Sequence, residues 1–341
     1  MADARKLKIA LVGCGGIAQA HWKGIQTYSP RIQVTAVIDT DAERAAAMAE
    51  QTGATPFTSL AEALAQGDFE AVDILLAHSL HEEAAVLAFA AGKHVVLEKP
   101  MAHNLASAAR IQAAAKQAGT VFMVAEQAQY WPDARAVRDL IQAGAIGEII
   151  TARAFFGGPT RPLGDGPRPW RYDLAMAGGG ITMDGGAHWI RPLRMWLVEI
   201  DEVVAVTGRP LAEMDGESLS RSILRFRSGT VAILDALTAG AAMGPGEEFR
   251  VTGTEGEILI EKGWGGRVLL FDREHREGKV ILDNKDEGRA AAFGYELNDF
   301  VGAVLDGTPL EAGPEYSLGE LRTAFAIYRS AESRQWEKVW E

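Results

Sequence analysis

The chain has a single cysteine, no excess of positive charge and no long apolar run, and each of these absences excludes a class of protein. Cys14 is the only cysteine among 341 residues, which excludes an intrachain disulfide and a metal cluster built on cysteine. The formal net charge of −12 argues against nucleic acid or an anionic membrane as the main partner. No segment approaches the roughly 18 apolar residues that a membrane span needs. We therefore expect a cytoplasmic protein.

The bulk composition is that of a folded globular protein. Hydrophobic residues make up 48% of the chain and charged residues 23%, which are ordinary values. At 341 residues the chain is long enough for about two domains. The sequence contains no internal repeat and no low-complexity tract.

The first residues superficially resemble a secretion signal with a lipoprotein cleavage site. Arg5, Lys6 and Lys8 precede an apolar stretch that ends at Cys14. The apolar core at 9–12 is shorter than the roughly 7–15 residues that a signal needs. We therefore expect this stretch to form a strand.

A glycine-rich turn follows the apolar run at 9–12. Gly13, Gly15 and Ala18 form the pattern G-x-G-x-x-A there. In a dinucleotide-binding turn the first glycine allows a sharp bend and the second leaves room for a pyrophosphate. The third small residue lets the helix pack close to the strand. The alternative is a glycine turn that serves packing alone.

Asp39 follows a second apolar run at 34–38, about 20 residues past the turn. A carboxylate at this point can accept hydrogen bonds from both hydroxyls of a ribose, and it repels a 2′-phosphate. The sequence therefore predicts NAD rather than NADP, although Arg44 could soften the preference.

Apolar strands and helices then alternate to about residue 125, which predicts a parallel sheet covered on both faces. After that point strand-like runs with short connections predict an α+β arrangement that is mostly antiparallel. We expect a Rossmann domain at 1–125 and a second domain at 126–341. A loop is expected at 157–172 and helices at 182–197, 289–305 and 317–332.

Lys99 follows the strand expected at 94–97 and precedes Pro100. In open parallel sheets, ligands bind outside the carboxyl ends of the strands. Proline restricts the residue before it to extended geometry, so Lys99 would be aimed rather than mobile. The alternative is an ordinary solvated lysine.

Asp184 and His188 are four residues apart in the helix expected at 182–197, so they would share one face. An acid beside a histidine can fix its tautomer and keep it ready as a base. A surface ion pair or a histidine satisfied in the core would give the same spacing. A zinc site would need further ligands, and His78 and His81 occur without an H-E-x-x-H pattern, so we expect no metal.

Several segments together resemble the glucose-fructose oxidoreductase/inositol dehydrogenase (Gfo/Idh/MocA) family. They are GCGGIA at 13–18, the acid Asp39, GKHVVLEKP at 92–100, GAIGEI at 144–149 and GGGITMDGGAH, which ends at His188. The resemblance implies a Rossmann domain followed by a domain with a large open sheet. The free face of that sheet usually builds dimers or tetramers.

The resemblance also implies roles for single residues. Lys99 corresponds to the lysine beside substrate and nicotinamide, and Asp184 and His188 correspond to the family's acid and catalytic histidine. His188 would remove a hydroxyl proton, Lys99 would stabilise the resulting negative charge, and Asp184 would orient His188. The expected cofactor-binding residues are Gly13, Gly15, Gly16, Ile17, Ala18, Asp39, His78, His81, Glu98, Lys99 and Gln127.

A substrate pocket is expected to include side chains from the loops of the second domain. Besides Lys99, Asp184 and His188, the candidates are Tyr130, Trp131, Arg161, Arg168, Trp170, Arg171 and Tyr172. Aromatic faces stack on the C–H faces of sugars, and arginines donate to hydroxyls. Trp170 and Tyr172 could equally anchor the loop. Trp189 and Trp196 are expected to serve packing.

The chain departs from the family pattern at three places. Leu76-Ala77-His78 replaces Thr-Pro-Asn, Gln127-Ala128-Gln129 replaces Asn-x-Arg, and Arg191 replaces an acid. Loss of the arginine at 129 weakens the case for a phosphorylated or carboxylated substrate. Arg191 places one contact to a substrate hydroxyl in doubt, or changes only local packing.

The sequence thus predicts an NAD-dependent dehydrogenase that oxidises a secondary hydroxyl of a neutral sugar, sugar derivative or cyclitol. The alternatives are a keto-sugar reductase, a glycosidase or epimerase that recycles its NAD, and a sensor that binds nucleotide without catalysis.

Overall fold

The computed structural model describes residues 5–159, 168–241, 244–286 and 288–341. Contacts divide the chain into two units. The first unit contains residues 1–126 and 290–318, and the second contains residues 127–289 and 319–341.

The first unit is built on a six-stranded parallel sheet with the order β3-β2-β1-β4-β5-β6. This order confirms the predicted Rossmann fold. The strands are β1 (Leu7–Val12), β2 (Ile32–Ile38), β3 (Thr55–Phe57), β4 (Ala71–Ile74), β5 (His94–Glu98) and β6 (Phe122–Ala125). The helices between them are α1 (Gly16–Tyr28), α2 (Ala42–Thr52), α3 (Leu60–Gln66), α4 (His81–Ala90) and α5 (Leu105–Ala118), with a short 3-10 helix η1 (His78–Leu80).

Local sequence explains where these elements begin. β1 lies in the middle of the sheet between β2 and β4, so the charged and apolar N-terminal stretch is a strand, as predicted. Asp41 caps α2 by accepting hydrogen bonds from the N–H groups of Glu43 and Arg44. Ser59 and Asn104 cap α3 and α5 in the same way.

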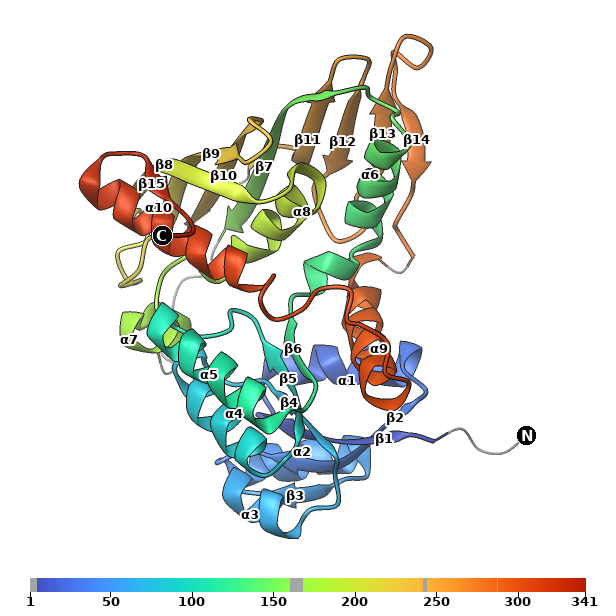
Figure 1. Ribbon diagram of the computed structural model, residues 1–341, viewed down its shortest axis with the longest axis vertical. Coiled ribbons are helices and arrows are strands. Elements are labelled where there is room, and N and C mark those ends of the chain that lie inside the picture. The colour runs from blue at the N-terminus through green and yellow to red at the C-terminus, as the bar shows by residue number, and fades with distance from the viewer. Residues whose placement is uncertain (1–4, 160–167, 242–243, 287) are drawn as a thin grey trace. The chain divides into compact units, whose positions relative to one another are not determined.

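The last helix of the first unit comes from far along the chain. Helix α9 (Ala292–Leu305) packs beside α1 (Figure 1). Leu297, Phe300 and Val301 join the core beneath the sheet. The predicted domains at 1–125 and 126–341 did not anticipate this return, because the hydrophobic pattern of a helix does not say which sheet it covers.

The second unit is built on a nine-stranded sheet with the order β14-β13-β12-β11-β7-β10-β9-β8-β15. Among the strands of the described residues, only the β7–β10 pair of this sheet is parallel, so the mostly antiparallel sheet is confirmed. The strands are β7 (Ile149–Pro159), β8 (Ile200–Gly208), β9 (Leu219–Phe226), β10 (Val231–Ala239), β11 (Glu247–Gly253), β12 (Glu257–Glu261), β13 (Val268–Phe271), β14 (Lys279–Leu282) and β15 (Glu337–Lys338).

One face of this sheet is covered by α6 (Pro132–Gln142), α8 (Ala187–Leu197) and α10 (Leu318–Ser333) (Figure 1). Further short helices are η2 (Gln127–Tyr130), η3 (Trp170–Tyr172), α7 (Leu174–Ala177) and η4 (Gly288–Ala291). Trp189 and Trp196 of α8 pack against Phe249 of β11, as predicted. The opposite face exposes apolar side chains, including Val206, Ile223 and Ile233.

None of the helices within the described ranges is both long and apolar enough to cross a membrane.

The contact between α1 and α9 gives the first testable prediction. A Cβ atom on Gly24 would lie 2.8 Å from the backbone nitrogen of Gly294. We expect Gly24→Ala to lower the free energy of unfolding by about 1–3 kcal/mol, because overpacking forces the backbones apart. Urea denaturation followed by circular dichroism measures the change.

Gly302→Ala in α9 is the matched control, since only the rotatable Thr308 hydroxyl lies close to an added methyl group. It should be neutral or stabilising, as alanine favours helix. An equal loss in both variants would contradict the close-contact explanation.

Candidate functional site

The glycine turn after β1 has the geometry of a phosphate site. Gly13 has a φ of +103°, and a Cβ there would lie 2.6 Å from the Leu75 carbonyl oxygen, so only glycine fits. Gly15 is the N-cap of α1 and makes no side-chain capping bond. A Cβ on Gly15 or Gly16 would meet nothing within 4 Å. The start of α1 therefore offers backbone N–H groups and open space to a pyrophosphate.

Asp39 is fixed at the end of β2, beside this turn. Its Oδ2 accepts a hydrogen bond of 2.9 Å from the Cys14 N–H, and its Oδ1 accepts one of 2.9 Å from the Asp41 N–H. Burial and the charge of Asp39 raise the pKa of the Cys14 thiol to about 11, so the thiol stays neutral beside the turn. Arg44 lies 3.3 Å from Asp39 and 3.2 Å from Asp41, so two carboxylates share its charge.

A cavity of about 350 Å³ opens beside Asp39, within the first unit. It is mostly apolar, with carboxylate and hydroxyl groups at one side, which suits a nucleoside. Its lining includes Val12, Ile38, Asp39, Thr40, Ser59, Leu76 and Leu80. The turn, the acid and the cavity together fit the adenosine diphosphate half of NAD.

Lys99 leaves the carboxyl end of β5 and is half-buried. The Lys99–Pro100 peptide is cis. Buried His81 connects the neighbouring turns, with Nδ1 3.0 Å from the Pro100 carbonyl and Nε2 3.0 Å from that of Leu76. Burial lowers the pKa of His81, and the hydrogen bonds to the carbonyls of Leu76 and Pro100 oppose that shift. Its predicted contact with the cofactor, like that of neighbouring His78, stays a prediction.

The predicted helical spacing of Asp184 and His188 is wrong. Helix α8 begins at Ala187, and residues 181–186 form turns, so Asp184 lies before the helix. A side chain at position 185 would clash with the Phe156 ring, so glycine is needed there. Because glycine disfavours helix, α8 starts after this residue. Asp184 Oδ2 accepts a hydrogen bond of 2.7 Å from Arg171 Nε.

His188 lies in the first turn of α8, and its ring centroid is 5.9 Å from that of Trp131. The guanidinium of Arg289 stacks on the same Trp131 ring, with its carbon 3.8 Å from the ring centroid. Arg289 is itself held by Asp133 at 2.8 Å and by Glu248 at 2.6 Å. His188 therefore adjoins a rigid aromatic and ionic cluster.

Two residues that the sequence did not single out fix the loop ahead of Asp184. The Glu217 carboxylate accepts hydrogen bonds of 2.8 Å from the N–H groups of both Gly180 and Thr182. It also accepts one of 3.1 Å from the Tyr328 hydroxyl. A Cβ on Gly179 would lie 2.2 Å from that hydroxyl, which explains the glycine there. No sequence signal links positions 180, 217 and 328.

The predicted sugar-contacting residues are partly engaged within their own loop. Arg168 donates to the carbonyls of Tyr172 and Glu213, at 2.9 Å each, and to Asp215 at 2.7 Å. The Arg171 guanidinium lies 4.4 Å from the Trp170 ring centroid. Tyr130 is buried, and Arg161 lies outside the described residues. The substrate contacts of these residues stay predictions.

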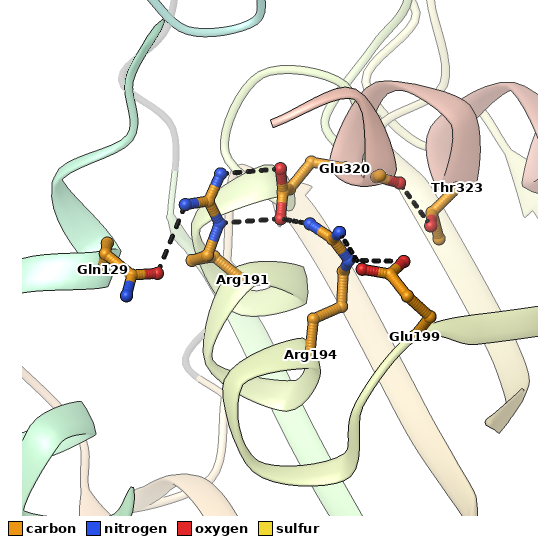
Figure 2. Close-up of polar contacts among 7 residues, drawn as sticks. Gln129, Arg191, Arg194, Glu199, Glu320 and Thr323 are labelled. Atoms are coloured by element: carbon orange, nitrogen blue, oxygen red, sulfur yellow. Dashed lines mark hydrogen bonds and ion pairs between the residues drawn. The ribbon is translucent and has the colours of Figure 1, made fainter. Parts of the chain in front are cut away.

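Figure 2 shows that two departures from the family pattern meet in one network. Arg191 binds both oxygens of Glu320, at 2.8 and 2.9 Å, and also donates to Gln129 Oε1 at 3.3 Å. Arg194 contacts Glu320 as well and pairs with Glu199. Arg191 is wholly buried, so here it ties α8 to α10 and η2.

The predicted catalytic residues are distributed over both units. Lys99 belongs to the first unit with the glycine turn and Asp39, whereas Asp184 and His188 belong to the second. Gln127, predicted to touch the cofactor, is buried at the start of the second unit, and its Oε1 has no hydrogen-bond partner among the described residues. The described side chains include no group of three His, Cys, Asp or Glu that could hold a metal ion.

Comparison with known proteins decides the family. Residues 7–126 match the oxidoreductase family with an NAD-binding Rossmann fold, and residues 134–259 match the GFO/IDH/MocA C-terminal domain. The chain belongs to the Gfo/Idh/MocA oxidoreductase family. The predicted resemblance is thereby confirmed, and with it the NAD-binding character of the first unit.

Relatives of this Gfo/Idh/MocA protein act on sugars and cyclitols. It is 35% identical over 314 residues to the 1,5-anhydro-D-fructose reductase of Ensifer adhaerens, covering 89% of this chain and 90% of that protein. It is 31% identical over 323 residues to inositol 2-dehydrogenase 3 of Saccharopolyspora erythraea, covering 93% and 90%. The structure of GenD2 from gentamicin A biosynthesis in complex with NAD superimposes with a TM-score of 0.83 at 27% identity, covering 98% and 97%.

The network of Figure 2 gives the second prediction. We expect Arg191→Ala to lower the free energy of unfolding by about 3–5 kcal/mol, because Glu320 would keep a buried charge with half of its partners removed. Guanidinium denaturation measures the loss.

Arg153→Ala is the control, since Arg153 is half-exposed and its carboxylate partners lie 3.6 and 3.9 Å away. Its removal should cost within about 1 kcal/mol. A similarly small loss for Arg191→Ala would show that the buried pair contributes nothing.

Proposed function

We propose that this enzyme oxidises a secondary hydroxyl of a neutral sugar, sugar derivative or cyclitol and reduces NAD. The observation that carries the proposal is the lysine at the carboxyl end of β5, in the same NAD-binding unit as the glycine turn and Asp39. Ligands of doubly wound sheets bind along this edge, so Lys99 lies on the side where a reacting group would be.

The residues of the chain would divide the chemistry as follows. Bound NAD supplies the acceptor for the hydride. His188 removes the hydroxyl proton, since histidine is the side chain that most often serves as a general base in enzymes. Lys99 donates a hydrogen bond to the same oxygen as negative charge develops. Asp184, held by Arg171, orients the substrate or His188.

The charge of the loop residues supports a neutral substrate. Arg168 is paired with Asp215, Arg171 with Asp184, and Arg191 with Glu320. Each guanidinium is thus compensated by a carboxylate of this chain. A phosphorylated or carboxylated substrate would need positive charge that these pairs do not offer.

Reduction of a keto-sugar is the second candidate. It is favoured by the 35% identity to a protein named as a reductase in Ensifer adhaerens. The same residues would then run the reaction in reverse, with His188 returning a proton. Asp39 supports NAD as the cofactor in either direction, since its carboxylate faces the turn.

The same proposal includes a cytoplasmic location and a homodimer or homotetramer formed through the open face of the nine-stranded sheet. The signal-like stretch at residues 5–14 supports the location, because it contains the central strand β1. The assembly is supported by exposed apolar side chains on three adjacent strands, with Val206 64%, Ile223 42% and Ile233 44% exposed.

The third prediction tests the reaction. NADH formation would be followed by absorbance across neutral sugars, glycosides and inositols, with NAD and NADP in parallel and keto-sugars with NADH in reverse. We expect sustained turnover with one substrate class and with NAD. We expect Lys99→Ala and His188→Ala each to lower turnover at least about 100-fold while NAD still binds.

Lys116→Ala and His275→Gln are the controls, because these residues lie away from the predicted site, on α5 and in the β13–β14 connection. They should keep full rates. Near wild-type turnover of Lys99→Ala or His188→Ala would refute the assignment of roles. NAD binding without turnover on any compound would favour an enzyme that recycles its cofactor, or a sensor.

The fourth prediction tests the assembly. Ile233→Glu places a charge on the open face of the sheet, and we expect it to convert the oligomer to a monomer in size-exclusion chromatography with light scattering. Val86→Glu, on exposed α4 of the first unit, is the control and should leave the oligomer intact. A monomeric wild-type protein would contradict the proposal directly.

A further inference from the structure

A buried histidine in the first unit lies between carboxylates that the proposed reaction does not use. His21, in the middle of α1, is 0% exposed. Its Nδ1 is 2.8 Å from Asp73 Oδ2, on β4. Its Nε2 is 3.3 Å from Glu98 Oε1, the last residue of β5. His21 therefore links the interior of the unit to the residue that immediately precedes Lys99.

The surroundings of His21 favour a positive charge on it. Although burial alone would lower the pKa of His21, Asp73 and Glu98 raise that pKa well above its ordinary value. Only an imidazolium can donate from both ring nitrogens, as two carboxylate acceptors require. A positive charge on His21 thus compensates the buried carboxylates of Asp73 and Glu98, which would otherwise lack a counter-charge.

A third carboxyl group lies beside this pair. Glu296 of α9 has Oε1 3.8 Å from His21 Nε2, and neither of its oxygens makes a hydrogen bond with the described residues. Burial raises the pKa of Glu296 well above its ordinary value, His21 opposes that shift, and Glu98, Asp73 and Glu126 add to it.

The position of this group in the sheet relates it to one half of the cofactor. The glycine turn follows β1, and Asp39 with its cavity follows β2 on one side. Since β4 and β5 lie on the other side of β1, the second nucleoside of a dinucleotide lies over their carboxyl ends. Asp73 and Glu98 belong to these two strands.

We propose that His21 is a positioning residue for the nicotinamide half of the site, which it supports by holding Glu98 at the end of β5. Glu98 in turn sets the backbone that leads into Lys99 and Pro100. The inference rests on the proposed function only for the role of Lys99. The experiment that tests it measures the binding of NAD and ADP-ribose, so it does not require a known substrate.

The fifth prediction compares two ligands. The dissociation constants of NAD and of ADP-ribose, which lacks the nicotinamide, would be measured by calorimetry for wild type and His21→Gln. Glutamine cannot donate to Asp73 and Glu98 as a cation. We expect NAD to bind about tenfold more weakly. Loss of a residue that hydrogen-bonds to a ligand-holding side chain has an effect of this size at metal sites. ADP-ribose should bind within about twofold of wild type, since Asp39 and the glycine turn are intact.

Two controls separate positioning from general damage. Glu296→Gln keeps the size of a buried side chain whose oxygens make no hydrogen bond with the described residues, and it should leave both dissociation constants unchanged. His275→Gln removes a surface histidine–carboxylate pair, with Nδ1 2.9 Å from Asp272, and should also have no effect. Equal weakening of NAD and ADP-ribose in His21→Gln, or no weakening of either, would overturn the proposal.

A measurement on the unmodified protein covers the case in which His21→Gln does not fold. Nitrogen-15 NMR of labelled histidine reports the protonation of each ring nitrogen. We expect both His21 nitrogens to carry protons at pH 7.5. A neutral His21 ring would overturn the proposal. If turnover fails on every sugar but the ligand difference is found, the substrate assignment fails and the role of His21 stands.

Discussion

Buried charge is the constraint on which both units of this enzyme depend. An ionised side chain removed from water must have a counter-charge, and here the partners come from distant parts of the sequence. In the first unit His21 stands between Asp73 and Glu98. In the second unit Arg191 and Arg194 share Glu320. These pairs fix how the helices lie against their sheets, because other packings would leave a charge without its partner.

The same pairs lie directly behind the residues expected to react. Glu98 is adjacent to Lys99 in the chain, and Arg191 lies one turn after His188 on α8. Asp184 depends on a loop that Glu217 holds through two backbone N–H groups. The side chains that would touch substrate are few, and each is carried by backbone that a buried carboxylate or guanidinium holds in place.

Local patterns were sufficient to predict most of the first unit. The glycine turn and the acid after β2 act over a few residues, so sequence spacing reports them. The start of α8 could not be read in this way, since Gly185 owes its place to the Phe156 ring on another element. The sequence did not reveal the partners of His21 and Arg191 either, because these partners also lie on distant elements. An isolated charged residue in a sequence does not reveal which distant group compensates it.

The placement of α9 has a consequence for synthesis of the chain. The core of the NAD-binding unit includes Leu297, Phe300 and Val301, which are made long after β6 ends at Ala125. At ~5–20 residues per second, the ribosome needs roughly ten to thirty seconds to pass from one to the other. During that interval the face of α1 that carries Gly24 has no covering helix. The nascent Rossmann half therefore stays incomplete until a segment encoded after β14 of the second sheet has been made.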